Sequence, residues 1–441
     1  MSVTQAEGPR FPRQQLPEKF CNLERLVDGM SRRKLDGIVV STPYNVYYLS
    51  GFSGIAHKSD EPRPYAVVIS RHAPDNPVLL LADYYVSSLI SQPTWITDVR
   101  SFRAVMLPLD IPPAKNDIDR FISAGSGANG WVQNVRNNFS NSISAACRGA
   151  LADLGLSQGR VAFDDMRFGF QLGMDDVEVV DGYDPMMYAR AVKTEHEITM
   201  LKRSTALNQA AIEQSIASWQ RGMTWREFNH VYHCAAVNLG GFVRDPGAMI
   251  WGHPQGVDST VMLQSGLEDF EVRQGLHVMF DCHGTLDLYC WDGGKTWVVD
   301  GELVGTARTN ASATSEAAAV VMAAMRPGTR VSELQALGRS VYRKAGVSAA
   351  DSVLIFFHGL GLSHMDLEQV TADGAPNADW CLEAGMVVPL HILYPGPETE
   401  RVWVEEVVQV TADGGVPFLS LIHISEPTRR YAISYAVFCL K

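Results

Sequence analysis

Five ionisable side chains interrupt apolar, strand-like stretches in the second half of this 441-residue chain, and they constrain its fold more than any other feature. A carboxylate inside an apolar strand is costly unless it is paired or bound to a metal ion. The stretches are HVMFDCHGTLDLYCWDGGKTW, VLIFFHGLGLSHMD, GMVVPLHILYPG and VWVEEVVQVT. They predict consecutive strands of one sheet that carry Asp281, Asp292, His358, His391 and Glu405.

The spacing within these stretches suggests metal chemistry. If the residues between Asp281 and Asp292 form a hairpin, the two carboxylates face each other across adjacent strands, about 5 Å apart. That separation suits the clamping of two divalent ions roughly 3.5–4 Å apart. His358 ends a strand before a Gly-rich turn, where an imidazole is a natural ligand for zinc, manganese, iron or cobalt. His364 follows in a loop, where we expect it to contact substrate.

Each of these residues also has a simpler interpretation. An Asp in a strand commonly lies at a bulge or strand end, and a His is commonly a satisfied core residue. Glu405 stands next to Glu406, which is also typical of an exposed strand edge. The joint appearance of all five favours the metal role. Four tryptophans flank the site segments and are expected in the core, with a cage for a cationic substrate as the alternative: Trp251, Trp291, Trp297 and Trp403.

The pattern of apolar residues predicts two kinds of architecture along the chain. Residues 20–185 alternate strand-like and helix-like segments, which indicates a small α/β domain. Residues 186–419 combine helices with mostly sequential strands, so we predict an α+β domain with helices covering one face of an antiparallel sheet. The expected helices are 194–220, 314–326 and one that starts at Ser332 with a Ser332/Gln335 capping box. The expected strands are 275–283, 286–299, 353–357, 386–394 and 402–411.

The last segment, Ser420–Lys441, is expected to be non-native. Its sequence, SLIHISEPTRRYAISYAVFCLK, resembles translated sequencing-adapter read-through. A genuine apolar extension is the alternative, and an uninterrupted genomic read through this segment would establish it.

Composition narrows the classes of function. The formal net charge of −12 argues against nonspecific nucleic-acid binding, which needs basic patches. No apolar run is long enough to cross a bilayer, and the start of the chain lacks a signal-peptide core. The seven cysteines form no CxxC pair, which favours reduced thiols and a cytoplasmic location. A G-x-G-x-x-G match at 125–130 follows a helix-like segment, so we expect a loop there and no dinucleotide.

Three stretches resemble the creatinase / aminopeptidase P / prolidase superfamily. They are LDGIVVSTPYNVYYLSGFSG, ARAVKTEHEITMLKRSTALNQAAIE, and the ordered series Asp–x10–Asp, His-Gly-x-Gly-Leu, G-M-V and E-E-x-x-x-V-T. The resemblance covers about residues 20–415. It implies a creatinase-like N-terminal α/β domain at 20–185 and a pita-bread catalytic domain at 186–419.

The resemblance also implies a site with two metal ions held by two Asp, one His and two Glu. Asp281 and Asp292 match the two Asp, His358 matches the His, and Glu405 matches the last Glu. His391 stands where the family has its other Glu, which binds metal and moves a proton, so the ligand there is neutral. Three further positions depart from the family's peptidases. Where those peptidases carry a second His, this chain has Met365, with His364 one residue early, and where they carry an upstream His it has Ser259 or Thr260, with His253 out of register. The Arg of their D-x-T-R-T segment is replaced by Lys295.

The expected function is a metal-dependent hydrolase that cleaves a C–N bond, as in an Xaa-Pro dipeptide. Two divalent ions (Mn, Zn, Fe or Co) would be held by Asp281, Asp292, His358, His391 and Glu405, and His364 would steady the tetrahedral intermediate. We expect a dipeptide or other small-molecule substrate and a homodimer. One alternative is a relative of creatinase, ectoine hydrolase or an osmolyte lyase, acting on a small nitrogen or sulfonium compound with His358 or His391 as acid/base. The other is a catalytically inactive binding module.

Overall fold

The structure is a computed structural model that divides into two compact units. The N-terminal unit comprises Arg13–Thr199 and Gly359–Trp380, and the C-terminal unit comprises Met1–Pro12, Met200–His358 and Cys381–Lys441. The described residues are 11–12, 14, 19–54, 63–104, 115–122, 126, 130–251, 269–395 and 399–419, without the side chains of 115–117 and 244–251. The expected non-native segment 420–441, most of the loop at 125–130, and His253, Ser259 and Thr260 lie outside this description.

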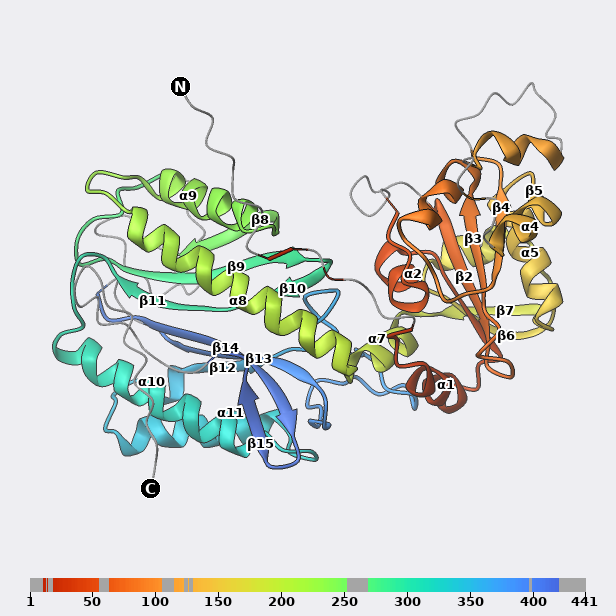
Figure 1. Ribbon diagram of the computed structural model, residues 1–441. Coiled ribbons are helices and arrows are strands. Elements are labelled where there is room, and N and C mark those ends of the chain that lie inside the picture. The colour runs from red at the N-terminus through yellow and green to blue at the C-terminus, as the bar shows by residue number, and fades with distance from the viewer. Residues whose placement is uncertain are drawn as a thin grey trace, which may run out of the picture. The chain divides into compact units, whose positions relative to one another are not determined.

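The N-terminal unit is built on a mixed seven-stranded sheet with the order β5-β4-β3-β2-β1-β6-β7 (Figure 1). Its central strands are buried along their whole length, which explains their near-continuous apolar sequences. The strands are β1 (Gly37–Val40), β2 (Tyr65–Ser70), β3 (Val78–Ala82), β4 (Asp98–Phe102), β5 (Phe139–Ser140), β6 (Gly159–Phe163) and β7 (Val177–Asp181). The α-helices are α1 (Leu23–Arg32), α2 (Pro43–Ser50), α4 (Trp131–Asn137), α5 (Ile143–Asp153), α6 (Met166–Gln171) and α7 (Tyr183–Ala191).

The C-terminal unit contains an antiparallel sheet with the order β10-β9-β11-β14-β13-β12, to which β8 and β15 add through β9 and β14 (Figure 1). Helices α8 and α9 pack on β9 and β11 through a shared apolar core, while α10 and α11 contact β12–β15. The predicted α+β arrangement is confirmed. The strands are β8 (Phe242–Trp251), β9 (His277–Leu286), β10 (Tyr289–Trp291), β11 (Gly294–Val298), β12 (Leu354–Phe357), β13 (Val387–Tyr394), β14 (Val402–Thr411) and β15 (Gly414–Pro417). The helices are α8 (Glu195–Ser218), α9 (Trp225–Asn238), α10 (Gly305–Ala324) and α11 (Val331–Lys344).

Several element boundaries differ from the expectations. The strand predicted over 286–299 is divided into β10 and β11, because Gly293 adopts φ 107° and bends the chain. Helix α10 begins nine residues before the predicted start, in a Ser/Thr/Asn-rich stretch that carries no apolar periodicity. The predicted Ser332/Gln335 capping box is wrong, because α11 already begins at Val331. Its Glu333 side chain instead accepts from the backbone N–H of Arg330.

A capping box at the start of α9 offers a direct test of local stability. Thr224 Oγ1 accepts from the Glu227 N–H at 3.3 Å, and the Glu227 carboxylate accepts from the Thr224 N–H at 2.8 Å. We expect Thr224→Ala to lower the free energy of unfolding by about 1 kcal/mol, since it leaves a helix-end donor unsatisfied. Urea denaturation followed by circular dichroism measures the change. Thr199→Ala, at an exposed position within α8, is the matched control and should change stability by less than about 0.5 kcal/mol.

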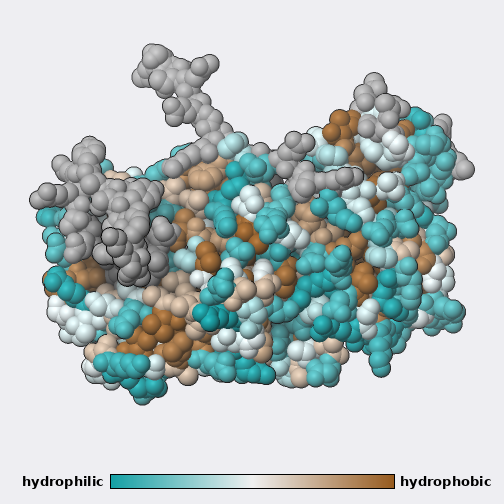
Figure 2. All heavy atoms as spheres, turned by 60° about the horizontal axis from the view of Figure 1, so that its bottom comes forward, coloured by the Kyte–Doolittle hydropathy of each residue, from teal (hydrophilic) through white to brown (hydrophobic). Residues whose placement is uncertain are grey.

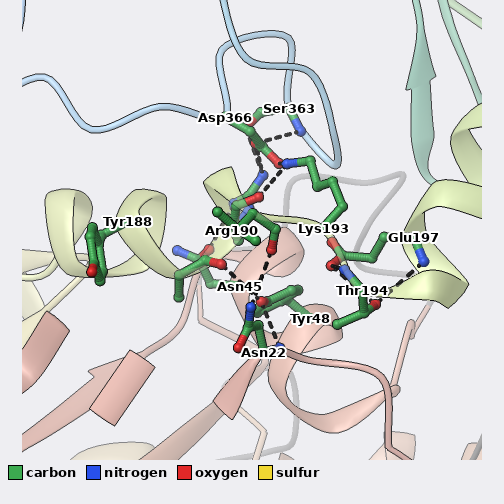
Figure 3. Close-up of polar contacts among 12 residues, drawn as sticks. Asn22, Asn45, Tyr48, Tyr188, Arg190, Lys193, Thr194, Glu197, Ser363 and Asp366 are labelled. Carbon is green, nitrogen blue, oxygen red and sulfur yellow. Dashed lines mark hydrogen bonds and ion pairs between the residues drawn. The ribbon is translucent and has the colours of Figure 1, made fainter. Parts of the chain in front are cut away.

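A buried charge cluster in the N-terminal unit joins two of the resembling stretches to the segment that follows His358 (Figure 3). The Asp366 carboxylate pairs with the Arg190 guanidinium and with Lys193 Nζ, the latter at 3.0 Å. Arg190 also donates to Asn45 Oδ1 at 2.8 Å and to Ser363 Oγ at 2.7 Å. All three charged side chains are at most 2% exposed. The cluster therefore fixes the segment that follows directly on His358 in the chain.

The surface and the cysteines agree with the composition. Figure 2 shows hydrophilic side chains spread between small hydrophobic patches over the face it presents. Among the residues the structure describes, no helix combines the length and apolarity that a membrane span requires.

The cysteines within the same residues are free thiols: Cys21, Cys147, Cys234, Cys282, Cys290 and Cys381.

Candidate metal centre

Four of the five expected ligands lie together in the C-terminal unit. His391 on β13 pairs directly with Glu405 on β14 across the sheet. His358 follows β12 by one residue, and Asp292 occupies the bend between β10 and β11. The donor atoms of these four residues all lie within 4.8 Å of one another, and each residue is at most 5% exposed.

The four side chains form two close pairs. His391 Nε2 lies 2.8 Å from Glu405 Oε1, and His358 Nε2 lies 3.3 Å from Asp292 Oδ2. The two imidazole rings are tilted against each other with centroids 4.9 Å apart. Phe356 of β12 stacks on the His391 ring at 4.2 Å and limits its rotation.

Asp281 stands beside this group rather than within it. Its strand partner by register is Met249 of β8. Its Oδ1 lies 2.9 Å from Nε2 of His283, and the same nitrogen lies 3.8 Å from Asp292 Oδ1. His283 thus lies beside the group, and the sequence interpretation did not name it. The available signal was its position two residues after Asp281 on one strand, which places both side chains on the same face.

The electrostatics of the group favour a cation. Burial, followed by the negative charges of Asp292 and Asp281, raises the pKa of Glu405 well above its usual value. No donor within the described part of the chain hydrogen-bonds to Glu405 Oε2. Three carboxylates in one buried region repel one another unless positive charge joins them. Carboxylate and imidazole donors suit manganese, zinc, iron and cobalt, so the residues present fit a divalent ion.

Strand β14 is an interior strand, and this decides the position of both of its glutamates. It pairs with β11 on one side and β13 on the other. Glu405 and Glu406 are only 3% and 4% exposed, so the alternative of an exposed strand edge is wrong. Glu406 is neutralised by Lys295 of β11, whose Nζ lies 3.0 Å from its Oε1.

The remaining candidates are His364 and the tryptophans that flank the site segments. His364 lies in the segment Gly359–Trp380 of the N-terminal unit, and its predicted substrate contact stays a prediction. Trp291 and Trp297 belong to the core between the sheet and helices α8 and α9, and Trp403 to a smaller core with Leu393. These three tryptophans therefore fill the core, as expected.

Comparison with known proteins identifies both halves of the chain. Residues 22–172 match the model of the creatinase/prolidase N-terminal domain, and residues 199–412 match that of metallopeptidase family M24. An uncharacterized peptidase of Staphylococcus aureus (strain MW2) is 21% identical over 399 residues, which are 90% of this chain and 97% of the relative. The expected class of enzyme, a hydrolase related to the Xaa-Pro peptidases, is confirmed at the level of the family.

The fold is shared with solved enzymes of the same group. The prolidase from Pyrococcus furiosus superposes with a TM-score of 0.63 at 17% identity, covering 90% of this chain and 100% of that chain. The Xaa-Pro dipeptidase from Bacillus anthracis gives 0.64 at 18% identity, with 90% and 96% coverage. Two matched domain models in the expected order, joined by this common fold, make the chain a member of the creatinase / aminopeptidase P / prolidase superfamily.

Proposed function

We propose that the protein is a metal-dependent hydrolase that cleaves the C–N bond of an Xaa-Pro dipeptide or a similar small amide. The observation that carries this proposal is the buried group of Asp292, His358, His391 and Glu405, with all donor atoms within 4.8 Å. The ligand set extends to Asp281, whose charge acts on Glu405. Two divalent ions, of manganese, zinc, iron or cobalt, complete the proposed centre.

Each part of the site has a chemical task in this proposal. A bound divalent ion supplies an activated water at neutral pH and polarises the substrate carbonyl. His391 stands in place of a carboxylate and would offer the ion a neutral nitrogen donor, whereas in the absence of the ion it would instead accept a proton from the attacking water. The Glu405 carboxylate, 2.8 Å from His391 Nε2, would hold the ion beside it or, without the ion, stabilise the protonated ring. His364 is the proposed contact for the tetrahedral intermediate.

Metal content and metal removal test the proposal. Elemental analysis of the untagged chain is expected to show divalent metal bound in stoichiometric amounts. Chelation should abolish the hydrolysis of Xaa-Pro dipeptides, and adding back manganese, zinc, iron or cobalt should restore it. Dipeptides without proline are the matched controls for substrate. A chain that binds no metal even after reconstitution, or that hydrolyses dipeptides equally well without it, would contradict the proposal.

One observation favours a second candidate function. His391 is fully packed into the position opposite Glu405, so the proton-moving carboxylate expected from the family is replaced by an imidazole. Paired with the carboxylates, His358 and His391 form an acid/base arrangement for a small nitrogen or sulfonium compound. Turnover of such a compound by the metal-free chain, with inactivity towards dipeptides, would establish this function in place of the first.

We further propose a homodimer in the cytoplasm. Light scattering at micromolar concentration is expected to give twice the mass of the chain, and a monomer would remove this part of the proposal.

A further inference from the structure

The C-terminal unit gathers three carboxylates and three imidazoles, one imidazole more than the expected ligand set contains. The additional ring is His283 on β9. Asp292 lies between two imidazoles: its Oδ1 is 3.8 Å from His283 Nε2, and its Oδ2 is 3.3 Å from His358 Nε2. The two oxygens of one carboxylate therefore face two separate groups of donors.

We propose that His283 is itself a ligand of the metal centre. With Asp281 and Oδ1 of Asp292 it would hold one divalent ion, while Oδ2 of Asp292 faces the group of His358, His391 and Glu405, which would hold the other. This inference rests on the proposed function and names the residue that completes its second metal position.

The spacing of the donors supports a shared ion at His283. Ligands bound at 2.0–2.2 Å in a tetrahedral arrangement lie about 3–4 Å from one another. The distances from His283 Nε2 to Asp281 Oδ1 and Asp292 Oδ1, 2.9 and 3.8 Å, fall in or close to this range. Asp281 and His283 also alternate correctly along β9 to face the same side of the sheet.

The chemistry of the whole set points the same way. His391 supplies a neutral donor where a carboxylate is expected, which leaves three carboxylates for two divalent ions. His283 adds a sixth donor residue without adding charge, so the ions keep enough ligands while the centre retains a net positive charge for a hydroxide. The His283 side chain is 23% exposed, whereas Asp292 is fully buried, so the ion at His283 is the one nearer to solvent.

A simpler role for His283 is to hold Asp281 in place through a hydrogen bond, and two substitutions separate the roles. His283→Gln keeps an N–H that can reach Asp281 but removes the strong nitrogen ligand, and His283→Ala removes both. His230→Ala, at an exposed position on α9, is the matched control for loss of an imidazole.

The test measures metal stoichiometry in the full-length chain, independently of activity. Elemental analysis and calorimetric titration with Mn²⁺ or Zn²⁺, together with the visible absorption of the Co²⁺-loaded protein, should show two ions per chain in the wild type and in His230→Ala. Both His283 variants should retain about one ion, and the Co²⁺ absorption band of the solvent-side ion should disappear. Circular dichroism confirms that each variant is folded.

The possible outcomes distinguish this inference from the function on which it rests. Two ions and an unchanged Co²⁺ spectrum in His283→Gln would overturn the ligand role of His283 and leave the hydrolase proposal intact. A wild type with a single ion that neither His283 variant removes would do the same. A wild type with no metal after reconstitution would overturn both proposals. If His283→Ala does not fold, His283→Gln decides the question alone.

Discussion

Replacing Asp366 with alanine is expected to lower the free energy of unfolding of the N-terminal unit by about 3–5 kcal/mol, because the change leaves buried cations without their partner. Asp366 pairs with Arg190 and Lys193, and none of the three side chains is more than 2% exposed. Ser363 Oγ adds a further hydrogen bond to the carboxylate at 2.6 Å.

The pH dependence of stability provides an independent check on this prediction. Although burial alone would raise it, the charges of Arg190 and Lys193 lower the pKa of Asp366 to about 2. A carboxyl group whose pKa is lower in the folded state contributes stability that is complete above its unfolded pKa, near 4, and is lost as the pH falls towards 2. The difference in the free energy of unfolding between the wild type and Asp366→Asn should therefore become smaller as the pH falls from about 4 to about 2.

Chemical denaturation of the full-length chain at pH 7 measures the effect of Asp366→Ala. Asp119→Ala is the matched control, because it removes the same side chain from an exposed ion pair with Arg136 in the same unit. Exposed pairs contribute about 0–1 kcal/mol, so the control should remain close to the wild type. A loss of less than about 1 kcal/mol in Asp366→Ala would show that the buried cluster adds little to stability.

For the proposed hydrolysis of Xaa-Pro dipeptides, Asp292→Asn is expected to lower kcat/KM by at least about 10³-fold, which is equivalent to about 4 kcal/mol of transition-state stabilisation. The substitution keeps the shape of the side chain but removes the charge that lies between His283 and His358. The metal content should fall in parallel. Asp300→Asn, at an exposed position in the same unit, is the matched control and should retain both metal and activity.

In the metal-free protein, we expect Asp292→Asn to leave thermal stability unchanged or to raise it, although the same substitution lowers activity and metal content. Burial and the charges of Asp292 and Asp281 raise the pKa of Glu405, so the metal-free wild type loses stability as the pH rises above the unfolded pKa of a Glu. Removing the charge at Asp292 lessens this repulsion. At pH 7 the metal-free variant should unfold at the same temperature as the metal-free wild type, or at a higher one. A lower melting temperature would indicate a structural role for Asp292 instead.

The sequence alone was sufficient to predict the α+β class, most strands and the four residues that lie together in the candidate centre, namely Asp292, His358, His391 and Glu405. Period-2 alternation and long apolar runs depend on local burial, so β13 and β14 were predicted to within one residue of their limits. Polar residues such as His391 and Glu405 stand out within such strands because burying them is costly. A local rule is enough to detect each of them.

Contacts between distant segments were decided only by the tertiary structure. Arg190 and Asp366 are 176 positions apart, and nothing local shows that their charges cancel in a buried cluster. Glu406 is buried because β14 lies between β11 and β13, which depends on strand order and not on the sequence of β14. His283 Nε2 likewise lies 3.8 Å from Asp292 Oδ1 because the chain bends at Gly293 and brings Asp292 towards β9. The free-energy cost of burying a polar side chain makes that residue recognisable within its own strand. Strand order and chain bends determine which partner offsets the cost.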